Sequence, residues 1–357
     1  MQDIANRLGV SVSTVSKGLN GGRDISEDLR AAILDTAIEL GYTSRSARKR
    51  ESGRLALFIE NMDCSSESDF GYDIVMGFRQ AANRDNWAVD VIPLTKTFQN
   101  SERYDRWMVE HKYAGAYFLG LALDSPWMDQ LYNTTVPSAL LDNFIPANPN
   151  VACVGTDNDE AIDMAVGHLH ALGHEKIAFL NGSRGSQVSD QRMYAYLNSM
   201  AKRHLLIDPN LAVYDYFVAE VADEHVPSFI DGGATAILCG NDLIASGVIR
   251  SVTGLGLNVP DDISVVGFDD LPLAETLDPP LTTIRQNRTA LGRCGYYALY
   301  AMLGSVAIAK NLLRPALIIR GSTAVCRPRI ATKHPDNQKS VLSVNPQMYN
   351  QFVKTSL

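Results

Sequence analysis

The sequence predicts an α/β protein in which a small helical head precedes a large body of parallel sheets and crossover helices. Three observations predict this fold class. Residues 3–40 carry apolar residues at helical spacing, with a glycine between the first two helical stretches. From residue 55 onward, short apolar runs alternate with helical patterns. The length of 357 residues, with 46% hydrophobic and 20% charged residues, suits two or three globular domains.

The head is predicted over residues 1–42 as a helix-turn-helix. Ile4 and Leu8 share one face of a first short helix, and Gly9 supplies the left-handed turn that follows it. Ser11 is placed to cap a second helix, and Ser26 to cap a third. Three short helices with a glycine turn between the first two are typical of this motif.

The outward face of the second helix carries small polar residues and one lysine. Val15 is expected to face inward, whereas the outward positions are Val12, Ser13, Ser16 and Lys17. Hydroxyl groups and a long cation suit the major groove of DNA, where they reach bases and phosphates. The alternative is a generic three-helix bundle, in which these side chains have no packing role.

Charge is distributed unevenly along the chain, whose net charge is −8. Residues 1–54 hold 9 basic and 7 acidic residues, and the remainder holds 23 basic and 33 acidic residues. An acidic body repels DNA, so contact with DNA is expected through the head alone.

The body is predicted as two doubly wound α/β halves with parallel strands. The expected strands lie at 55–59, 88–92, 114–119, 137–141, 151–154, 176–181, 211–217, 234–239, 263–267, 281–284 and 315–320. Helical patterns near 72–84, 102–111 and 125–132 separate the first four strands.

Motifs of other function classes are absent from the sequence. There is no P-loop, no His-Glu-x-x-His and no Gly-x-Ser-x-Gly motif, so we expect no enzyme and no cofactor. His170 and His174 would share a helix face, but nothing nearby completes a metal site, and we expect polar positions near a helix end. Five scattered cysteines without a Cys-x-x-Cys indicate a reducing compartment. We expect a cytoplasmic protein with no membrane contact, because neither a long apolar segment nor a secretory signal is visible.

The chain resembles the LacI (lac-repressor/GalR) family of bacterial transcription regulators. The matching elements of the head are Asp3-Ile4-Ala5, Leu8-Gly9-Val10-Ser11, Thr14-Val15-Ser16-Lys17, Leu19-Asn20 and Leu40-Gly41-Tyr42. In the body, the resemblance is strongest around His168–His174, Asn241-Asp242, Asp269-Asp270 and Leu281–Ile284, and it extends to about residue 328. It implies a periplasmic-binding-protein-like body whose chain crosses between two subdomains near 154–156, 282–286 and 315–319.

The resemblance implies residues for DNA contact. Val12, Ser13 and Lys17 would read bases, and Thr14, Ser16 and Asn20 would hold phosphates or cap the helix. In the family, a hinge helix follows and ends in a leucine that wedges into the minor groove, but this chain has no leucine between 43 and 54. That stretch is either a solvated linker, or Arg48 and Arg50 enter a narrow minor groove without a kink.

The expected effector cleft lies beyond the carboxyl ends of the body strands. Asp142, Asn241 and Asp269 each follow an apolar run there. By resemblance, Arg192, Asn241 and Asp269 match effector contacts, and Asp142 and Gln286 match less closely. Carboxylates and a guanidinium suit the hydroxyls of a polyol. Asp269 alternatively caps a helix. Three aromatic residues are expected to line or cover the cleft, although each could instead belong to the core: Phe70, Tyr72 and Phe217.

We therefore expect a DNA-binding repressor, a homodimer on a pseudo-palindromic operator, controlled by a sugar or sugar derivative. The alternative is a sugar-binding sensor without effective DNA binding. The expected division is a head at 1–42, a hinge at 43–54, a body at 55–330 and a polar tail at 331–357. Within the body, one subdomain comprises about 55–153 and 286–314, and the other about 156–283 and 318–330.

The start of the first helix lacks a capping side chain, because Met1 stands one step after the family's threonine cap. We expect either a natural start a few codons upstream or a first helix that frays.

Overall fold

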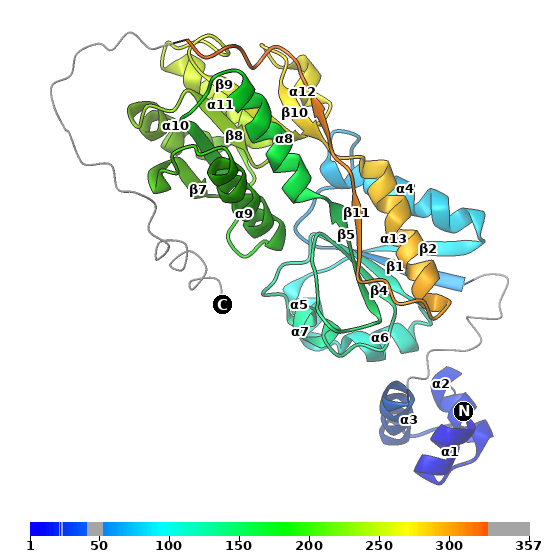
Figure 1. Ribbon diagram of the computed structural model, residues 1–357. Helices are drawn as coiled ribbons and strands as arrows, with labels where there is room; N and C mark the ends of the chain where they lie inside the picture. Colours follow the sequence, from blue (N-terminus) through cyan, green and yellow to red (C-terminus); the bar gives the residue numbers. More distant parts are fainter. Residues whose placement is uncertain (21, 23, 41–52, 328–357) are drawn as a thin grey trace. The chain divides into compact units, whose positions relative to one another are not determined.

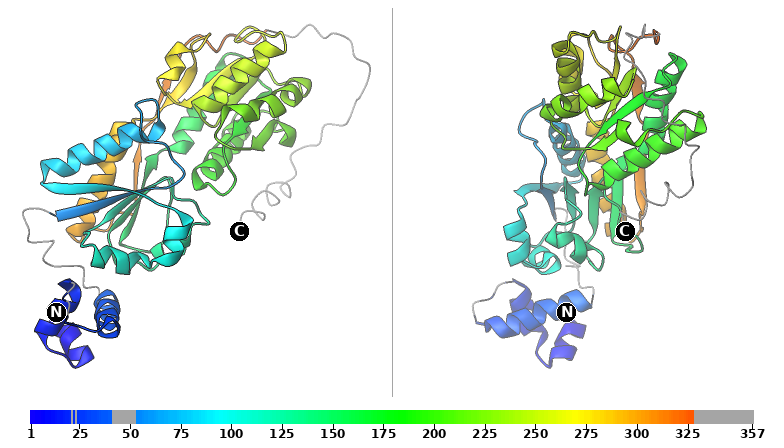
Figure 2. Two further views of the ribbon diagram at one scale, coloured as in Figure 1. Left: turned by 180° about the vertical axis from the view of Figure 1, so that it is seen from behind. Right: turned by 90° about the vertical axis from the view of Figure 1, so that its left-hand side faces the viewer.

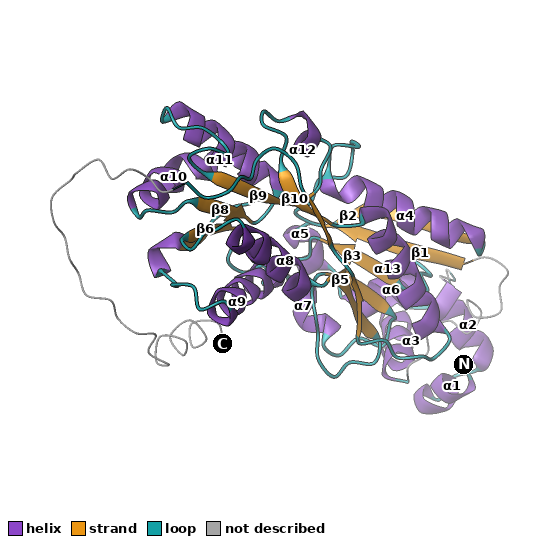
Figure 3. Cartoon of the chain, turned by 45° about the horizontal axis from the view of Figure 1, so that its top comes forward, coloured by secondary structure: helices purple, strands orange, loops and turns teal. Residues whose placement is uncertain are grey.

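The computed structural model describes residues 1–20, 22, 24–40 and 53–327, of which all but Arg327 belong to one unit of the fold, Met1–Cys326. Figure 1 follows the chain through this unit, and Figure 2 gives two further views. The predicted α/β class is confirmed: Figure 3 separates a head made of helices from a body that contains two groups of strands.

The head consists of three helices packed around a small apolar core. They are α1 (Gln2–Leu8), α2 (Val12–Asn20) and α3 (Glu27–Glu39). Ile4, Val15 and Ile33 are fully buried where the three helices meet. Gly18 of α2 faces α3 so closely that a Cβ there would lie 2.6 Å from Ile33 Cδ1. The absence of a side chain at this position therefore allows the two helices to approach each other.

The first sheet has six strands in the order β11-β5-β4-β3-β1-β2, and all its pairings are parallel. Helices α4 and α13 lie side by side on one face, and α5, α6 and α7 cover the other (Figures 1 and 2). The strands are β1 (Gly53–Ile59), β2 (Trp87–Pro93), β3 (Ala116–Leu119), β4 (Ser138–Leu141), β5 (Val151–Thr156) and β11 (Lys310–Leu313). The helices are α4 (Phe70–Arg84), α5 (Lys96–Ser101), α6 (Tyr104–Glu110), α7 (Pro126–Leu131) and α13 (Arg288–Leu303).

The second sheet has the order β12-β10-β9-β8-β6-β7. Helices α8 and α9 cover one face, and α10 and α11 the other. Its strands are β6 (Ile177–Asn181), β7 (Ala212–Tyr214), β8 (Ala236–Cys239), β9 (Ser264–Asp269), β10 (Thr282–Arg285) and β12 (Ala316–Ile318). Its helices are α8 (Asn158–Ala171), α9 (Gln187–Lys202), α10 (Ala222–Asp231), α11 (Asp242–Gly254) and the short α12 (Leu273–Thr276), with 3-10 turns at Pro209–Leu211 and Ala219–Val221.

The chain passes between the two sheets three times. It leaves the first sheet after β5, returns to it after β10, and crosses again between β11 and β12. These passages lie near the positions that the family resemblance implied, 154–156, 282–286 and 315–319. Because the strands on each side are parallel, their carboxyl ends gather beside these crossings.

Five details differ from the sequence predictions. The helix α5 and the strand β11 were not predicted, and α6 begins at Tyr104 rather than near residue 102. The strand β12 pairs with β10 in antiparallel orientation, so the second sheet is mixed rather than wholly parallel. His174 does not share a helix with His170, because α8 ends at Ala171.

Candidate functional site

The second helix of the head presents the face that the sequence predicted. Val15 is fully buried, whereas Val12, Ser13, Lys17 and Asn20 are exposed. The other two predicted contact residues of this helix, Thr14 and Ser16, are partly buried. The helix thus exposes one row of mostly polar side chains over an apolar anchor.

Local sequence signals hold this helix in place. Gly9 has φ +66°, the left-handed conformation that ends α1 and turns the chain into α2. The Ser11 hydroxyl accepts a hydrogen bond from the Thr14 N–H at 3.1 Å, and Ser26 caps α3 in the same way by accepting from the Leu29 N–H. Met1 makes no side-chain cap at α1, as expected from its chemistry.

The polar groups of α2 already have partners within the head. Lys17 Nζ forms an ion pair with Asp24 Oδ2 at 2.5 Å, and Asn20 Nδ2 donates to the Ser16 carbonyl at 2.8 Å. Both Lys17 and Asp24 are more than half exposed, and such surface pairs contribute little stability. Lys17 can therefore exchange this carboxylate for a phosphate or a base. Arg48 and Arg50, the predicted minor-groove contacts, lie outside the described residues.

The body brings a second set of predicted residues together at the carboxyl ends of its strands. Asp142 follows β4, Asp269 ends β9, and Gln286 follows β10. Gln286 Nε2 donates to Asp269 Oδ1 at 2.7 Å. Asp269 has φ +112°, a strained value for a residue with a side chain, and Asp270 follows at φ +56°. The turn after β9 therefore holds the Asp269 carboxyl in a fixed direction.

Arg192 of α9 is buried at the same place. Its Nη1 donates to the Gly240 carbonyl at 2.6 Å and its Nε to Asn158 Oδ1 at 3.0 Å. The guanidinium lies 3.7 Å from the centroid of the Phe268 ring, a cation–π contact. These contacts fix the plane of the guanidinium.

Burial shapes the electrostatics of this cluster. It raises the pKa of Asp142 to about 6 against the opposing effect of Arg192. It likewise raises the pKa of Asp269 to about 6, although Arg192, Gln286 and Arg288 lower it. Burial lowers the pKa of Arg192, while both aspartates raise it. The three groups thus act on one another electrostatically.

Several buried polar atoms near these strand ends have no hydrogen-bond partner within the described structure. They are Thr156 Oγ1, Asn181 Oδ1, Ser189 Oγ and Gln286 Oε1. Each belongs to a residue that is almost wholly buried. Unpaired buried polar atoms are costly, and a bound ligand is one way to satisfy them.

The remaining predicted body residues take other positions. Asn241 caps α11, because its Oδ1 accepts from the Ile244 N–H at 2.8 Å. Asp269, for which a helix cap was the alternative, caps no helix. Phe217 packs against the backbone of Gly182, where a Cβ would overlap its ring. Phe70 is partly buried against the core between α4, α13 and the first sheet, and Tyr72 is half-buried in the same first turn of α4.

Sequence reasoning missed two supporting residues. Asn158 orients Arg192 as described above, and its signal was its place directly after β5 and an aspartate cap. Asp242 is fully buried and accepts from the Leu271 N–H at 2.7 Å and from Thr283 Oγ1 at 2.6 Å. It therefore holds the turn that follows Asp269, a role that depends on residues distant in sequence.

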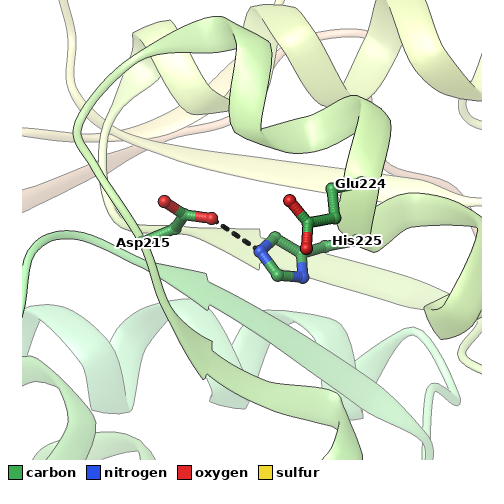
Figure 4. A group of neighbouring side chains, drawn as sticks. All are labelled: Asp215, Glu224 and His225. Atoms are coloured by element: carbon green, nitrogen blue, oxygen red, sulfur yellow. Dashed lines mark hydrogen bonds and ion pairs between the residues drawn. The ribbon is translucent and has the colours of Figure 1, made fainter.

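A histidine and two carboxylates lie together beyond β7. Figure 4 shows Asp215, Glu224 and His225, whose potential ligand atoms all lie within 4.8 Å of one another. His225 Nε2 and Asp215 Oδ2 are hydrogen-bonded at 2.7 Å, and Glu224 is exposed. The Asp215–His225 bond ties the start of α10 to the loop that carries Phe217.

A cavity of about 600 Å³ lies away from the buried polar cluster of Asp142, Arg192, Asp269 and Gln286. It lies at the amino ends of β6 and β8, whereas that cluster lies at the carboxyl ends of the strands. Its lining is His170, Gly173, Glu175, Lys176, Arg203, His204, Leu205, Leu206, Thr235 and Cys326. Arg203 is already bound to Asp163 at 2.6 Å, and Lys176 Nζ donates to the Gly232 carbonyl at 2.7 Å. We therefore consider the buried polar cluster, with its unpaired polar atoms, the stronger candidate for an effector site than this cavity.

Comparison with known proteins gives two family matches. The family described as bacterial regulatory proteins, lacI family, matches residues 1–44, and the periplasmic binding protein-like domain matches residues 166–323. The chain is 29% identical over 337 residues to the HTH-type transcriptional regulator reg1 of Streptomyces lividans, with 91% of this chain and 96% of that protein covered. It is 26% identical over 331 residues to the HTH-type transcriptional repressor CytR of Escherichia coli, with 90% and 96% covered.

Two solved structures of transcriptional regulators are similar to this chain in fold. A transcriptional regulator CelR–cellobiose complex superimposes with a TM-score of 0.68 at 24% identity, covering 89% of this chain and 98% of that one. The lac repressor dimer bound to operator and the anti-inducer ONPF superimposes with a TM-score of 0.63 at 25% identity, covering 90% and 98%. Within the described residues, no helix has the length and apolar character needed to cross a membrane.

Proposed function

We propose, from the premise that this chain is a transcriptional regulator of the LacI family with a DNA-binding domain, that a small ligand in its body sets its affinity for an operator. We further propose that it acts as a repressor, that it works as a homodimer in the cytoplasm, and that its operator is pseudo-palindromic. The divisions at 1–42, 43–54, 55–330 and 331–357 belong to this proposal.

The exposed face of α2 is the observation that carries the DNA-binding part. Its side chains project from a helix that Gly9 and Ser11 position and that Val15 anchors. In helix-turn-helix proteins the second helix enters the major groove and its first residues contact base edges. We assign base contacts to Val12, Ser13 and Lys17, and phosphate contacts to Thr14, Ser16 and Asn20. A dimer would present two such helices to two half-sites one or more helical turns apart.

The buried polar cluster supports the ligand-control part. We assign Asp142, Arg192, Asp269 and Gln286 to contacts with an effector. Asn241 would add an N–H donor of its side-chain amide, and the ring of Phe217 would cover one side of the effector. A set of fixed donors and acceptors at a junction of two sheets suits a sugar or sugar derivative. The cellobiose complex of CelR is a neighbour in fold that accords with this class.

Control of operator affinity requires a difference in ligand affinity between two arrangements of the protein. A ligand that binds one arrangement of the two sheets better shifts the population toward it and so changes how the two heads are spaced. The crossings of the chain beside the cluster are where such a change would be accommodated.

Two measurements test the proposal. Gel shifts of fragments of the source genome should show a specific complex with the purified chain, and a thermal-shift screen of sugars should identify a compound that raises the melting temperature and alters that complex. A chain that binds sugar but shifts no DNA would instead be a sugar-binding sensor. A chain that shifts DNA identically with every stabilising ligand would exclude ligand control.

A further inference from the structure

The polar atoms of the candidate effector site are dominated by hydrogen-bond acceptors. Gln286 Oε1 and Asn181 Oδ1 are buried acceptors without a partner in the described structure. The carboxyls of Asp142 and Asp269 add further acceptor positions, and the described residues donate to the second of these only through Gln286 Nε2. A ligand that satisfies these atoms has to bring O–H or N–H groups.

The donors available to a ligand are fewer. Arg192 has spent two of its N–H groups on Asn158 and Gly240. The hydroxyls of Thr156 and Ser189 can each donate once, but hydroxyls can equally accept. The site is therefore complementary to a molecule with many hydroxyl groups.

The fixed charges of the site oppose an anion. Asp142 and Asp269 act on Arg192 and on each other, so one guanidinium faces two carboxyls. Gly155 contributes to this arrangement, since a Cβ there would lie 2.6 Å from Asp142 Oδ1 and would displace the carboxylate. When both carboxyls are ionised, they outnumber the single guanidinium of Arg192, and these three groups together carry negative charge.

Neighbouring cations are already engaged. Arg288 is paired with Asp73 at 2.9 Å and is almost buried. Arg285 is paired with Asp270 at 2.5 Å, and Lys310 lies over the ring of Phe144. Arg288 still lowers the pKa of Asp269, but within the described residues its guanidinium, like that of Arg285, is already paired with a carboxylate.

We propose that this site selects an uncharged polyhydroxylated ligand and that Asp142 and Asp269 exclude sugar acids and phosphosugars. The inference rests on the proposed effector site, whose ligand class it narrows. The two aspartates act as specificity-determining residues: they accept hydroxyl protons from a neutral ligand and repel a carboxylate or phosphate placed beside them.

Matched ligands test this with the full chain. Isothermal titration calorimetry at pH 7.5 would compare glucose, galactose and cellobiose with glucuronate, galacturonate, cellobionate and the 6-phosphates of the two hexoses. At least one neutral sugar should bind, and its acid or phosphate should bind at least about tenfold more weakly, since like charges in contact oppose binding. In Asp142→Asn, the ratio of the affinity for the neutral sugar to the affinity for its acid should fall several-fold, because the acid binds more tightly.

Asp129→Asn is the control, because it removes one carboxylate from the exposed surface of α7 and should leave the ratio unchanged. Thermal melting of each variant shows that it is folded. If an acid or phosphate binds as tightly as its neutral parent, Asp142 and Asp269 do not exclude anions, and the charge filter proposed here is wrong. The proposed function as a ligand-controlled regulator is then unaffected. Absence of binding by every sugar, whatever its charge, overturns both the filter and the sugar part of the proposed function. Equal ratios in Asp142→Asn and the wild type remove Asp142 from the filter.

Discussion

At the scale of single residues, the sequence predicted which polar residues lie at the ends of strands, but not which residues they contact. Asp142 and Asp269 were found because polar residues follow apolar runs, and strand ends expose what comes next. Gln286 was found only through the resemblance to the family. Their contacts could not be read from the sequence. The Asn158–Arg192 hydrogen bond joins residues 34 positions apart, and only the fold brings them together. Asn241 shows the converse, since its side chain is largely committed to capping α11.

Arg192 should be a strong determinant of effector binding. Arg192→Ala leaves the Asp142 and Asp269 carboxyls without their cation and removes donors from the ligand, so effector affinity should fall by about 1–3 kcal/mol in calorimetry. Operator affinity without ligand should change little. Arg79→Ala, on the exposed surface of α4, is the matched control and should bind effector normally. Unchanged effector affinity in Arg192→Ala would refute the assigned site.

Lys17 should contribute to operator binding once it leaves Asp24. Lys17→Ala should weaken the complex, and the kind of loss identifies the contact. A loss confined to particular operator sequences indicates a base, whereas a uniform loss with a shallower salt dependence indicates a phosphate. Gel shifts at several salt concentrations measure both. Lys202→Ala, an exposed lysine of α9, is the control. If Lys17→Ala binds all operators as the wild type does, Lys17 is not in the interface.

Asp142 should make stability depend on pH. Its pKa is raised to about 6 in the folded chain, above the ordinary value in an unfolded chain. Stability from this group is therefore fully present below about pH 4 and is lost as the pH rises through about 6. Relative to wild type, Asp142→Asn should gain about 1 kcal/mol of unfolding free energy between pH 5 and pH 7. Denaturant titrations at both pH values measure this, and a constant difference between the two proteins would contradict it.

At the scale of elements, apolar runs located the strands well, and the exceptions share a cause. The strand β11 reads Lys310-Asn311-Leu312-Leu313, is partly exposed at the edge of its sheet and pairs with β5 alone among the described strands. An edge strand does not need an apolar run, so periodicity cannot detect it. Helix α5 is short and mostly polar, and it was lost for a similar reason. By contrast, the caps at Ser11 and Ser26 were predictable because capping is a local interaction.

The close approach of α2 and α3 should be sensitive to side-chain size at Gly18. Gly18→Val places a branched side chain where a Cβ would already lie 2.6 Å from Ile33 Cδ1. Overpacking of this kind costs about 1–3 kcal/mol. We expect the head to melt at a lower temperature and operator binding to weaken, while the melting of the body and its effector binding stay unchanged. A head of unaltered stability in Gly18→Val would mean that α2 and α3 can separate at little cost.

At the scale of the whole molecule, the distribution of charge favours DNA contact by the head over DNA contact by the body. Residues beyond 54 carry an excess of acidic side chains, so the body is a poor partner for DNA. The sequence predicted the first body strand from residue 55, and β1 begins at Gly53.

Removal of residues 1–52 should therefore separate the two activities. This deletion spares β1, including Arg54, which is paired with Asp90 at 2.7 Å. The fragment retains both sheets and their four body cores, so it should fold cooperatively, dimerise and bind effector with the affinity of the full chain. It should lose specific gel shift, because the helix that contacts the operator is gone and the remaining surface is acidic. Sedimentation measures dimerisation, calorimetry measures effector binding, and gel shift measures DNA binding. A fragment that still shifted operator DNA would place the DNA-binding surface in the body, whereas one that failed to dimerise would assign the dimer contact to the head.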